Sequence, residues 1–222
     1  MLVGPCYIAP TPMRFLCISD IHGHAAALRA VIEEGKARDF QQLLVCGDLV
    51  FPGPEPLETW HLLLEHRAVC VQGLSDRAIA TVDPSKLVPA TAEQRARLDR
   101  LVGAKQRLGE LIVARLGKLP ATIRLPLENA EELLIVHGSP ADPTEPFTAD
   151  MTDDEMLALV GDDPADIIVC GGSHVPFHRQ LDGIHIVNVG SVGEAPSGGV
   201  AHGTLIDAGP FGMTLEQFEA VL

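Results

Sequence analysis

Aspartates and histidines recur in this chain directly after short apolar runs, a pattern typical of a metal site built from loops. Five motifs follow such runs, namely SDIHGH (19–24), CGDLV (46–50), QGLSD (72–76), IVHGSP (135–140) and GGSHVP (171–176). They supply five side chains with oxygen or nitrogen donors: Asp20, His22, Asp48, His137 and His174. Carboxylate oxygens combined with imidazole nitrogens suit Mn, Fe or Zn. The motifs therefore predict a divalent metal site.

The segments that carry the first motifs alternate between strand-like and helix-like patterns. Apolar runs predict strands at 14–19, 42–47 and 68–73, and helical periodicity predicts helices at 25–39 and 56–66. Such alternation indicates βαβ units, and in folds of this kind functional groups gather on the loops at strand ends. We therefore expect the motif residues to lie on loops near one another.

A long polar helix and a strand-rich segment make up the rest of the chain. Residues 91–117 predict one helix, with Gly103 as a point where it could break. Its apolar residues recur at helical spacing, so it either packs on the body of the domain or caps a substrate cleft. Further strands are predicted at 132–138, 165–172, 184–190 and 201–207, and helices at 152–161 and 215–222. The pattern favours an α/β fold with two packed sheets and outer helices, in a single domain of residues 1–222.

The composition is that of an acidic globular protein. The 222 residues include 30 Asp and Glu against 16 Lys and Arg, a net charge of −14. This balance argues against binding long nucleic acid through a basic surface. An acidic protein that handles an anionic substrate needs local positive charge, which a metal ion supplies. The five cysteines form no C-x-x-C pair and are expected to be reduced residues, four of them in apolar core strands.

The lengths of the apolar runs and the composition of the N-terminus indicate where the protein is located. No run reaches the roughly 18 to 20 apolar residues that a membrane span needs. A signal peptide begins with a positively charged segment, but no Lys or Arg precedes Arg14. We therefore expect a cytoplasmic protein without a membrane anchor. Residues 1–12 are expected to form a flexible extension, or to precede a translation start at Met13.

Taken in order, the motifs resemble those of the calcineurin-like metallophosphoesterases, and within that superfamily the bacterial phosphodiesterases. The family pattern runs D-x-H, G-D, G-N-H-D, V-H-G, G-H-x-H and N-x-G-S-V-G, and the resemblance extends over residues 14–207. It implies a four-layer αββα sandwich of two mixed β-sheets flanked by helices, with 91–117 as a helical insertion. It also implies hydrolysis of phosphate mono- or diesters by a metal-activated water, held by two cations about 3.5–4 Å apart.

The resemblance implies that one of the two metal positions is complete. Its ligands in the family correspond here to Asp20, His22, Asp48 and His174. The second position shares Asp48 and uses His137, but Leu74 and Gly172 stand where the family has Asn and His. Two ligands, one of them shared, seldom hold a divalent ion. The resemblance therefore predicts one Mn, Fe, Zn or Ni ion per chain and a degenerate second site.

Ser75 stands where the family has its catalytic histidine, which leaves Asp48 and Ser75 as the catalytic candidates. A serine cannot act as an acid near neutral pH, although its hydroxyl could donate a hydrogen bond to a phosphoryl oxygen. The missing imidazole should lower the rate by about 10² to 10⁴. Two other histidines could rebuild the second metal site: His24, just after the first motif, and His178, just after SHVPF.

Two functions are compatible with this pattern of retained and lost residues. The first is a metal-dependent phosphoesterase that acts on a small phosphorylated substrate. The second is a catalytically impaired relative that binds one metal and a phosphorylated ligand or a protein partner. Because members of the family commonly form dimers, a homodimer is a further expectation.

Overall fold

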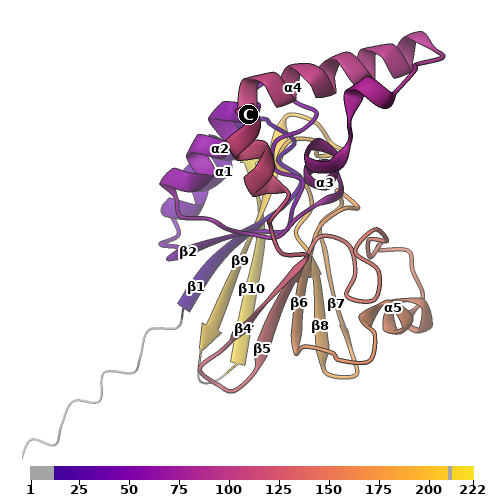
Figure 1. Cartoon of the computed structure of the whole chain (residues 1–222). Helices are drawn as coiled ribbons and strands as arrows, with labels where there is room; N and C mark the ends of the chain where they lie inside the picture. Colours follow the sequence, from indigo (N-terminus) through magenta and orange to yellow (C-terminus); the bar gives the residue numbers. More distant parts are fainter. Residues whose placement is uncertain (1–12, 210–211) are drawn as a thin grey trace, which may run out of the picture.

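Two five-stranded mixed sheets pack face to face, and helices lie on the outer side of each sheet (Figure 1). The computed structural model describes residues 13–209 and 212–222. Three apolar cores separate the four layers: one between each sheet and its helices, and one between the sheets. The predicted four-layer αββα architecture is therefore confirmed. The extension expected at 1–12 lies outside the described residues.

The first sheet has the strand order β10-β9-β1-β2-β3. Its strands are β1 (Met13–Ile18), β2 (Gln42–Val45), β3 (Val69–Cys70), β9 (Val200–Gly209) and β10 (Gly212–Val221). The first three run parallel, while β9 is antiparallel to β1 and to β10. Two helices, α1 (Ala25–Lys36) and α2 (Pro56–Glu65), lie on its outer side. This order places the carboxyl ends of β1 and β2 side by side.

Alternation along β1 divides its side chains between two cores. Leu16 and Ile18 pack in the helix-facing core, whereas Phe15 and Cys17 pack in the core between the sheets. Successive residues of a strand point to opposite faces, so a strand buried on both faces reads as the unbroken apolar run seen in the sequence. The reduced cysteines follow this pattern, since Cys17, Cys46 and Cys170 are buried without disulfide partners.

The second sheet has the order β4-β5-β6-β8-β7. Its strands are β4 (Thr122–Pro126), β5 (Glu132–Val136), β6 (Ile167–Cys170), β7 (Phe177–Leu181) and β8 (Ile184–Asn188). β5, β6 and β8 are parallel, and the edge strands β4 and β7 are antiparallel. One helix, α5 (Asp153–Val160), packs on the outer side, and Thr152 and Glu155 cap its first turn reciprocally.

Three helical segments join the two sheets: α3 (Leu74–Thr81), the 3₁₀ turn η1 (Pro84–Lys86) and α4 (Ala92–Leu116). The predicted long helix is confirmed, but its break falls at Gly109, with φ of 74°, and not at Gly103. Leu101, Ala104 and Leu108 of α4 are buried in the helix-facing core. The first turns of α4 project beyond the sandwich (Figure 1). None of the helices described here is both long and apolar enough to cross a membrane.

The helix predicted at 215–222 is wrong, because these residues belong to β10. Leu215, Phe218 and Val221 recur at helical spacing among good helix formers, which explains the prediction. In the structure, β10 pairs with β9 over ten residue pairs, from Gly212 to Val221. Strand formation depends on such non-local pairing more than on intrinsic preference. The short elements α3, β4 and β7 were also not predicted.

Phe147 supplies a test of the core behind the second sheet. This side chain is fully buried in the core beneath α5. Phe147→Ala should lower the free energy of unfolding by about 3–5 kcal/mol, because a large cavity would remain. Urea denaturation measures the change. Leu64→Ala is the control, since Leu64 is 51% exposed and its loss should change stability by less than about 1 kcal/mol. Equal effects would contradict the assigned packing.

Candidate metal centre

All five predicted ligand side chains converge at one edge of the sandwich. Asp20 and His22 follow β1, Asp48 follows β2, His137 follows β5 and His174 lies in the loop after β6. Because β1 and β2 are parallel in one sheet and β5 and β6 in the other, their carboxyl ends bring these loops together. The site is therefore assembled from both sheets.

Four of these residues adopt a left-handed backbone conformation. The φ angles are 53° for Asp20, 52° for His22, 55° for Asp48 and 61° for His174. Asp and His tolerate this region better than most residues, yet each instance costs on the order of 1 kcal/mol. Backbone hydrogen bonds maintain the conformation, such as that from His22 N–H to Asp48 O, at 2.9 Å. Such clustered strain is typical of functional loops.

Backbone carbonyls set the orientation of two imidazoles. His22 Nδ1 lies 2.6 Å from Phe51 O, and His137 Nδ1 lies 2.7 Å from Cys46 O. Because a carbonyl oxygen only accepts, each Nδ1 carries the hydrogen and donates it. In the neutral ring the opposite nitrogen, Nε2, then presents a lone pair toward the site. This is the usual preparation of a metal-binding histidine.

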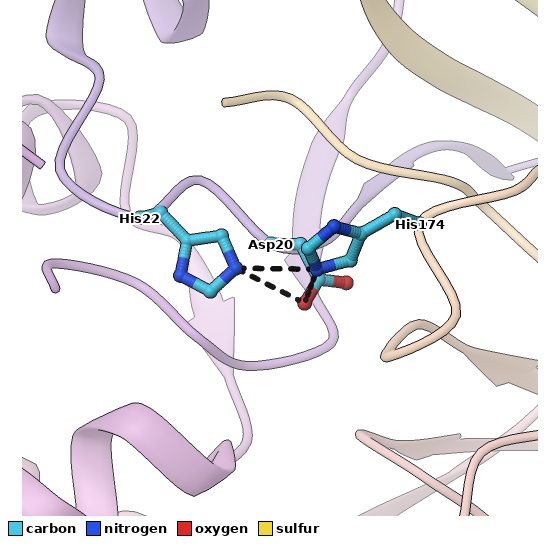
Figure 2. Close-up of side chains that lie close together, drawn as sticks. All are labelled: Asp20, His22 and His174. Carbon is cyan, nitrogen blue, oxygen red and sulfur yellow. Dashed lines mark hydrogen bonds and ion pairs between the residues drawn. The ribbon is translucent and has the colours of Figure 1, made fainter. Parts of the chain in front are cut away.

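The lone pairs of His22 and the carboxylate of Asp20 face one another (Figure 2). His22 Nε2 lies 3.6 Å from Asp20 Oδ1 and 3.3 Å from His174 Nε2, and His174 Nε2 lies 3.2 Å from the same carboxylate oxygen. Asp20 Oδ1 is buried and receives no geometrically aligned hydrogen bond from the described residues. Converging acceptors around an unsatisfied buried oxygen fit a divalent cation.

Two overlapping groups of three donors satisfy the spacing for an ion. One consists of Asp20, His22 and His174, and the other of Asp20, Asp48 and His137; within each, the donor atoms lie within 4.8 Å of one another. Asp20 belongs to both groups. Asp48 stands closer to His137 than to His22, with Oδ2 separations of 3.6 and 3.9 Å from their Nε2 atoms.

The shifted pKa values of the site's residues reflect an electrostatic field that favours positive charge. Burial tends to raise the pKa of Asp20, but His174 and His137 hold it below its usual value. The Asp20 carboxylate, 3.2 Å from His174 Nε2, raises the pKa of His174 despite partial burial. Burial opposes protonation of His137, yet the charges of Asp48 and Asp20 raise its pKa. The same negative charges would attract a cation.

Asp76 holds the Asp48 loop in place. Its buried carboxylate accepts hydrogen bonds from the N–H groups of Asp48, Leu49 and Gly73, at 2.9 to 3.0 Å. Burial and the nearby charge of Asp48 raise the pKa of Asp76 to about 7. A side chain at Gly73 would collide with Asp48, so this close approach of the two loops requires glycine. Asp76 thus positions Asp48 without belonging to either donor group.

The residues that depart from the family pattern line the site. Leu74 is 45% exposed, and it borders a cavity of about 80 Å³ together with His137 and Gly172. Gly172 donates its N–H to Asp20 Oδ2 at 2.9 Å and has φ of 76°. A Cβ there would approach Pro146 Cβ to 3.0 Å. Neither position supplies a side-chain ligand, and a larger residue at Gly172 would be strained.

Ser75 lies on the first turn of α3, beside Asp48. Its N–H donates to Asp48 Oδ1 at 2.7 Å. Its Oγ atom is buried and makes no hydrogen bond to the described residues. Together with His22 and Asp48, Ser75 lines a second cavity, of about 430 Å³. The hydroxyl therefore lies in the wall of that cavity without a hydrogen-bond partner among the described residues.

The two histidines considered as compensating ligands lie outside both donor groups. His24 immediately precedes α1 and borders a separate cavity with Glu55. His178 lies on β7, where its Nε2 is 2.9 Å from His185 Nδ1 and the two rings stack. Neither histidine is among the described candidates for the metal, so the structure offers no rebuilt second site through these residues.

Glu194 is a neighbour of the site that the sequence analysis did not single out. Its Oε2 lies 3.8 Å from His22 Nε2 and 3.9 Å from His174 Nδ1. The loop after β8 brings it there, because Ser191 Oγ donates to Asp20 O and accepts from Glu194 N–H, at 2.9 and 2.8 Å. Its position directly after the NVGSVG motif was the available signal.

Comparison with known proteins agrees with this architecture. A sequence profile described as the calcineurin-like phosphoesterase superfamily domain matches residues 13–208. An uncharacterized protein of Methanocaldococcus jannaschii is 25% identical over 180 residues, which cover 79% of this chain and 68% of that protein.

Two solved structures share the fold. A hypothetical protein from Pyrococcus horikoshii has a TM-score of 0.77 at 21% identity, over 94% of this chain and 88% of its own. A metallophosphoesterase from Sphaerobacter thermophilus has a TM-score of 0.72 at 23% identity, over 94% and 89% of the two chains. The superfamily inferred from the motifs is thus confirmed.

The geometry predicts opposite outcomes for two histidine substitutions. His174→Ala removes a donor that faces Asp20, so metal affinity should fall by about 100-fold or more. Removing a residue that only supports a metal ligand already lowers metal affinity by about 10- to 100-fold. His178→Ala is the matched control, because its ring stacks on His185 away from the donors. Calorimetric titration of the metal-free chain with Mn²⁺ or Zn²⁺ measures both. Similar losses in the two variants would contradict the assigned site.

The departures at Leu74 and Gly172 predict the number of ions. After dialysis against Mn²⁺ and then Zn²⁺, elemental analysis should find about one ion per chain, because only Asp48 and His137 of the second position's family ligands remain. About two ions per chain would show that Asp20, a water or another group completes that position. It would contradict the predicted single occupancy.

Proposed function

Because this chain belongs to the calcineurin-like phosphoesterase superfamily, we propose that it is a metal-dependent phosphoesterase that hydrolyses a small phosphate mono- or diester. One observation carries the proposal: the buried, unbonded Oδ1 of Asp20 faces the nitrogens of His22 and His174 beside an accessible cavity. A metallophosphoesterase is among the proteins that share this fold, which supports the same reading.

Asp20, His22, Asp48 and His174 would hold the metal, with His137 beside Asp48. When bound there, a divalent metal supplies Lewis-acid activation of a water molecule and of the phosphoryl group. The chain's own contribution is placement. Asp76 fixes the Asp48 backbone and the Ser75 N–H fixes the Asp48 carboxylate, while Phe51 O and Cys46 O fix the imidazoles of His22 and His137. Little reorganisation is then needed when substrate binds.

Ser75 determines how the leaving group departs. Its unpartnered Oγ can donate a hydrogen bond to a phosphoryl oxygen, but a hydroxyl is too weak an acid to protonate an alkoxide at neutral pH. The leaving oxygen must therefore depart as an anion or take its proton from water. We propose that the chain favours esters with acidic leaving groups.

Leu74 and Gly172 favour a second candidate function. Leu74 places an exposed apolar side chain, and Gly172 places backbone without a side chain, where the second metal position would need ligands. A protein with one metal and these surfaces could bind a phosphorylated ligand without turning it over. Hydrolysis assays separate the two functions, since only the first predicts turnover that requires metal and is lost on adding a chelator.

Restoring the missing imidazole tests the proposed role of Ser75. With Mn²⁺ present, Ser75→His should accelerate hydrolysis of phenyl esters by roughly 10²-fold or more, because a positioned general acid typically raises the rate by about 10²- to 10⁴-fold. The gain should be smaller for 4-nitrophenyl esters, whose leaving group needs less protonation. The measurement is kcat/KM for the phenyl and the 4-nitrophenyl esters, in the parent chain and in Ser75→His.

Ser85→His is the matched control, because Ser85 lies in η1 and bonds only to Asp83. It should leave both rates unchanged. An equal gain for the two esters, or none, would contradict the assignment of position 75 to leaving-group protonation. Complete absence of metal-dependent hydrolysis in the parent chain and in Ser75→His would favour the binding function.

A further inference from the structure

The cavity beside the metal ligands continues into an apolar one. The first, lined by His22, Asp48 and Ser75, is about 430 Å³ in volume, and the second is about 440 Å³. Both are lined by Phe51, Ala78 and Arg97, so they adjoin across these side chains. The second lies between α3, the segment 82–89 and the first turns of α4. Together they form one cleft that begins at the metal ligands.

Two arginines of α4 line the inner part of this cleft. Arg97 and Arg100 are three residues apart, so they lie on the same side of the helix. In the described part of the chain neither guanidinium pairs with a carboxylate, whereas five other arginines do: Arg14, Arg29, Arg38, Arg124 and Arg179. On a protein with a net charge of −14, two such cations beside the free Ser75 hydroxyl are complementary to an anion.

The outer part of the cleft presents uncovered apolar surface. Leu87 is 48% exposed and Val88 is 92% exposed, and both line it with Pro89, Leu98 and Leu101. Phe51 and Arg97 also border it, and both carry planar groups; a guanidinium stacks well on aromatic faces. A volume of about 440 Å³ is within the range of small-molecule sites.

We propose that the substrate is a phosphate ester with an aromatic substituent. Arg97, Arg100 and Ser75 bind its phosphoryl group beside the metal ligands, and the ring occupies the apolar part of the cleft against Leu87 and Leu98. This inference rests on the proposed function for the identity of the reacting group. It adds the chemical class of the substituent and makes the first turns of α4 its binding surface.

Phosphonates test the two parts separately, because their C–P bond is not a hydrolysable ester. Calorimetry on the full chain with saturating Mn²⁺ should show phenylphosphonate binding roughly 10-fold tighter than methylphosphonate, from burial of the ring. Arg97→Gln combined with Arg100→Gln should weaken both ligands by about 10-fold or more. Leu87→Ser combined with Val88→Ser should weaken phenylphosphonate alone and bring the two affinities within about threefold.

Each pair has a matched control on α4 outside the cleft. Arg95→Gln removes an exposed arginine, and Leu111→Ser removes an apolar side chain that is 68% exposed. Both should bind both phosphonates as the parent chain does. Because all the substituted side chains are exposed, thermal unfolding should be little changed, which checks that lost binding is not lost folding.

Failure of this inference can be told apart from failure of the proposed function. Equal affinity for the two phosphonates, or binding of neither, would overturn the aromatic subsite. A chain that sediments as a dimer until Leu87→Ser and Val88→Ser dissociate it would assign the surface to a second copy, and would also overturn it. Ring preference without any metal-dependent ester hydrolysis would uphold the aromatic subsite while contradicting the proposed function.

Discussion

Negative charge held in a buried place is the constraint on which this structure depends. The Asp20 carboxylate is buried, and within residues 13–209 and 212–222 only its Oδ2 receives a hydrogen bond, from Gly172. Burying an ionised carboxylate without full compensation costs several kcal/mol. The left-handed loops that carry the ligands add further strain. A bound cation would offset both, and the loops, the Asp76 anchor and the carbonyl-oriented imidazoles together form an arrangement that suits one.

The site was more predictable from the sequence than several of the elements around it. Each of the five ligand side chains follows an apolar strand and belongs to a short motif, so its type and its place at a strand end are both local features. Glu194 was missed because a contact between distant loops, Ser191 to Asp20, brings it near His22. β10 was mistaken for a helix for a similar reason, since its pairing with β9 leaves no trace in its own spacing.

The departures from the family motifs have a common location. Leu74 and Ser75 open α3, and α3 packs on α4. The turn that would carry a ligand and an acid therefore also forms the wall between the metal ligands and the cleft under α4. Replacing Asn and His by Leu and Ser removes polar groups from this wall and exposes apolar surface. The change that removes ligands from the second metal position therefore also adds apolar surface to the inner part of the cleft.

Because the candidate ligands come from both sheets, metal binding would depend on the docking of the two sheets. Asp20 and Asp48 come from one sheet, and His137 and His174 from the other. A chain whose sheets have formed but not docked offers incomplete donor groups, because each group takes two donors from the first sheet and one from the second. Contacts between segments this far apart in sequence form slowly during folding. An ion that binds only the docked state would add its binding energy to the stability of the whole sandwich, and apo and loaded chains should then differ in their global unfolding rather than in one loop.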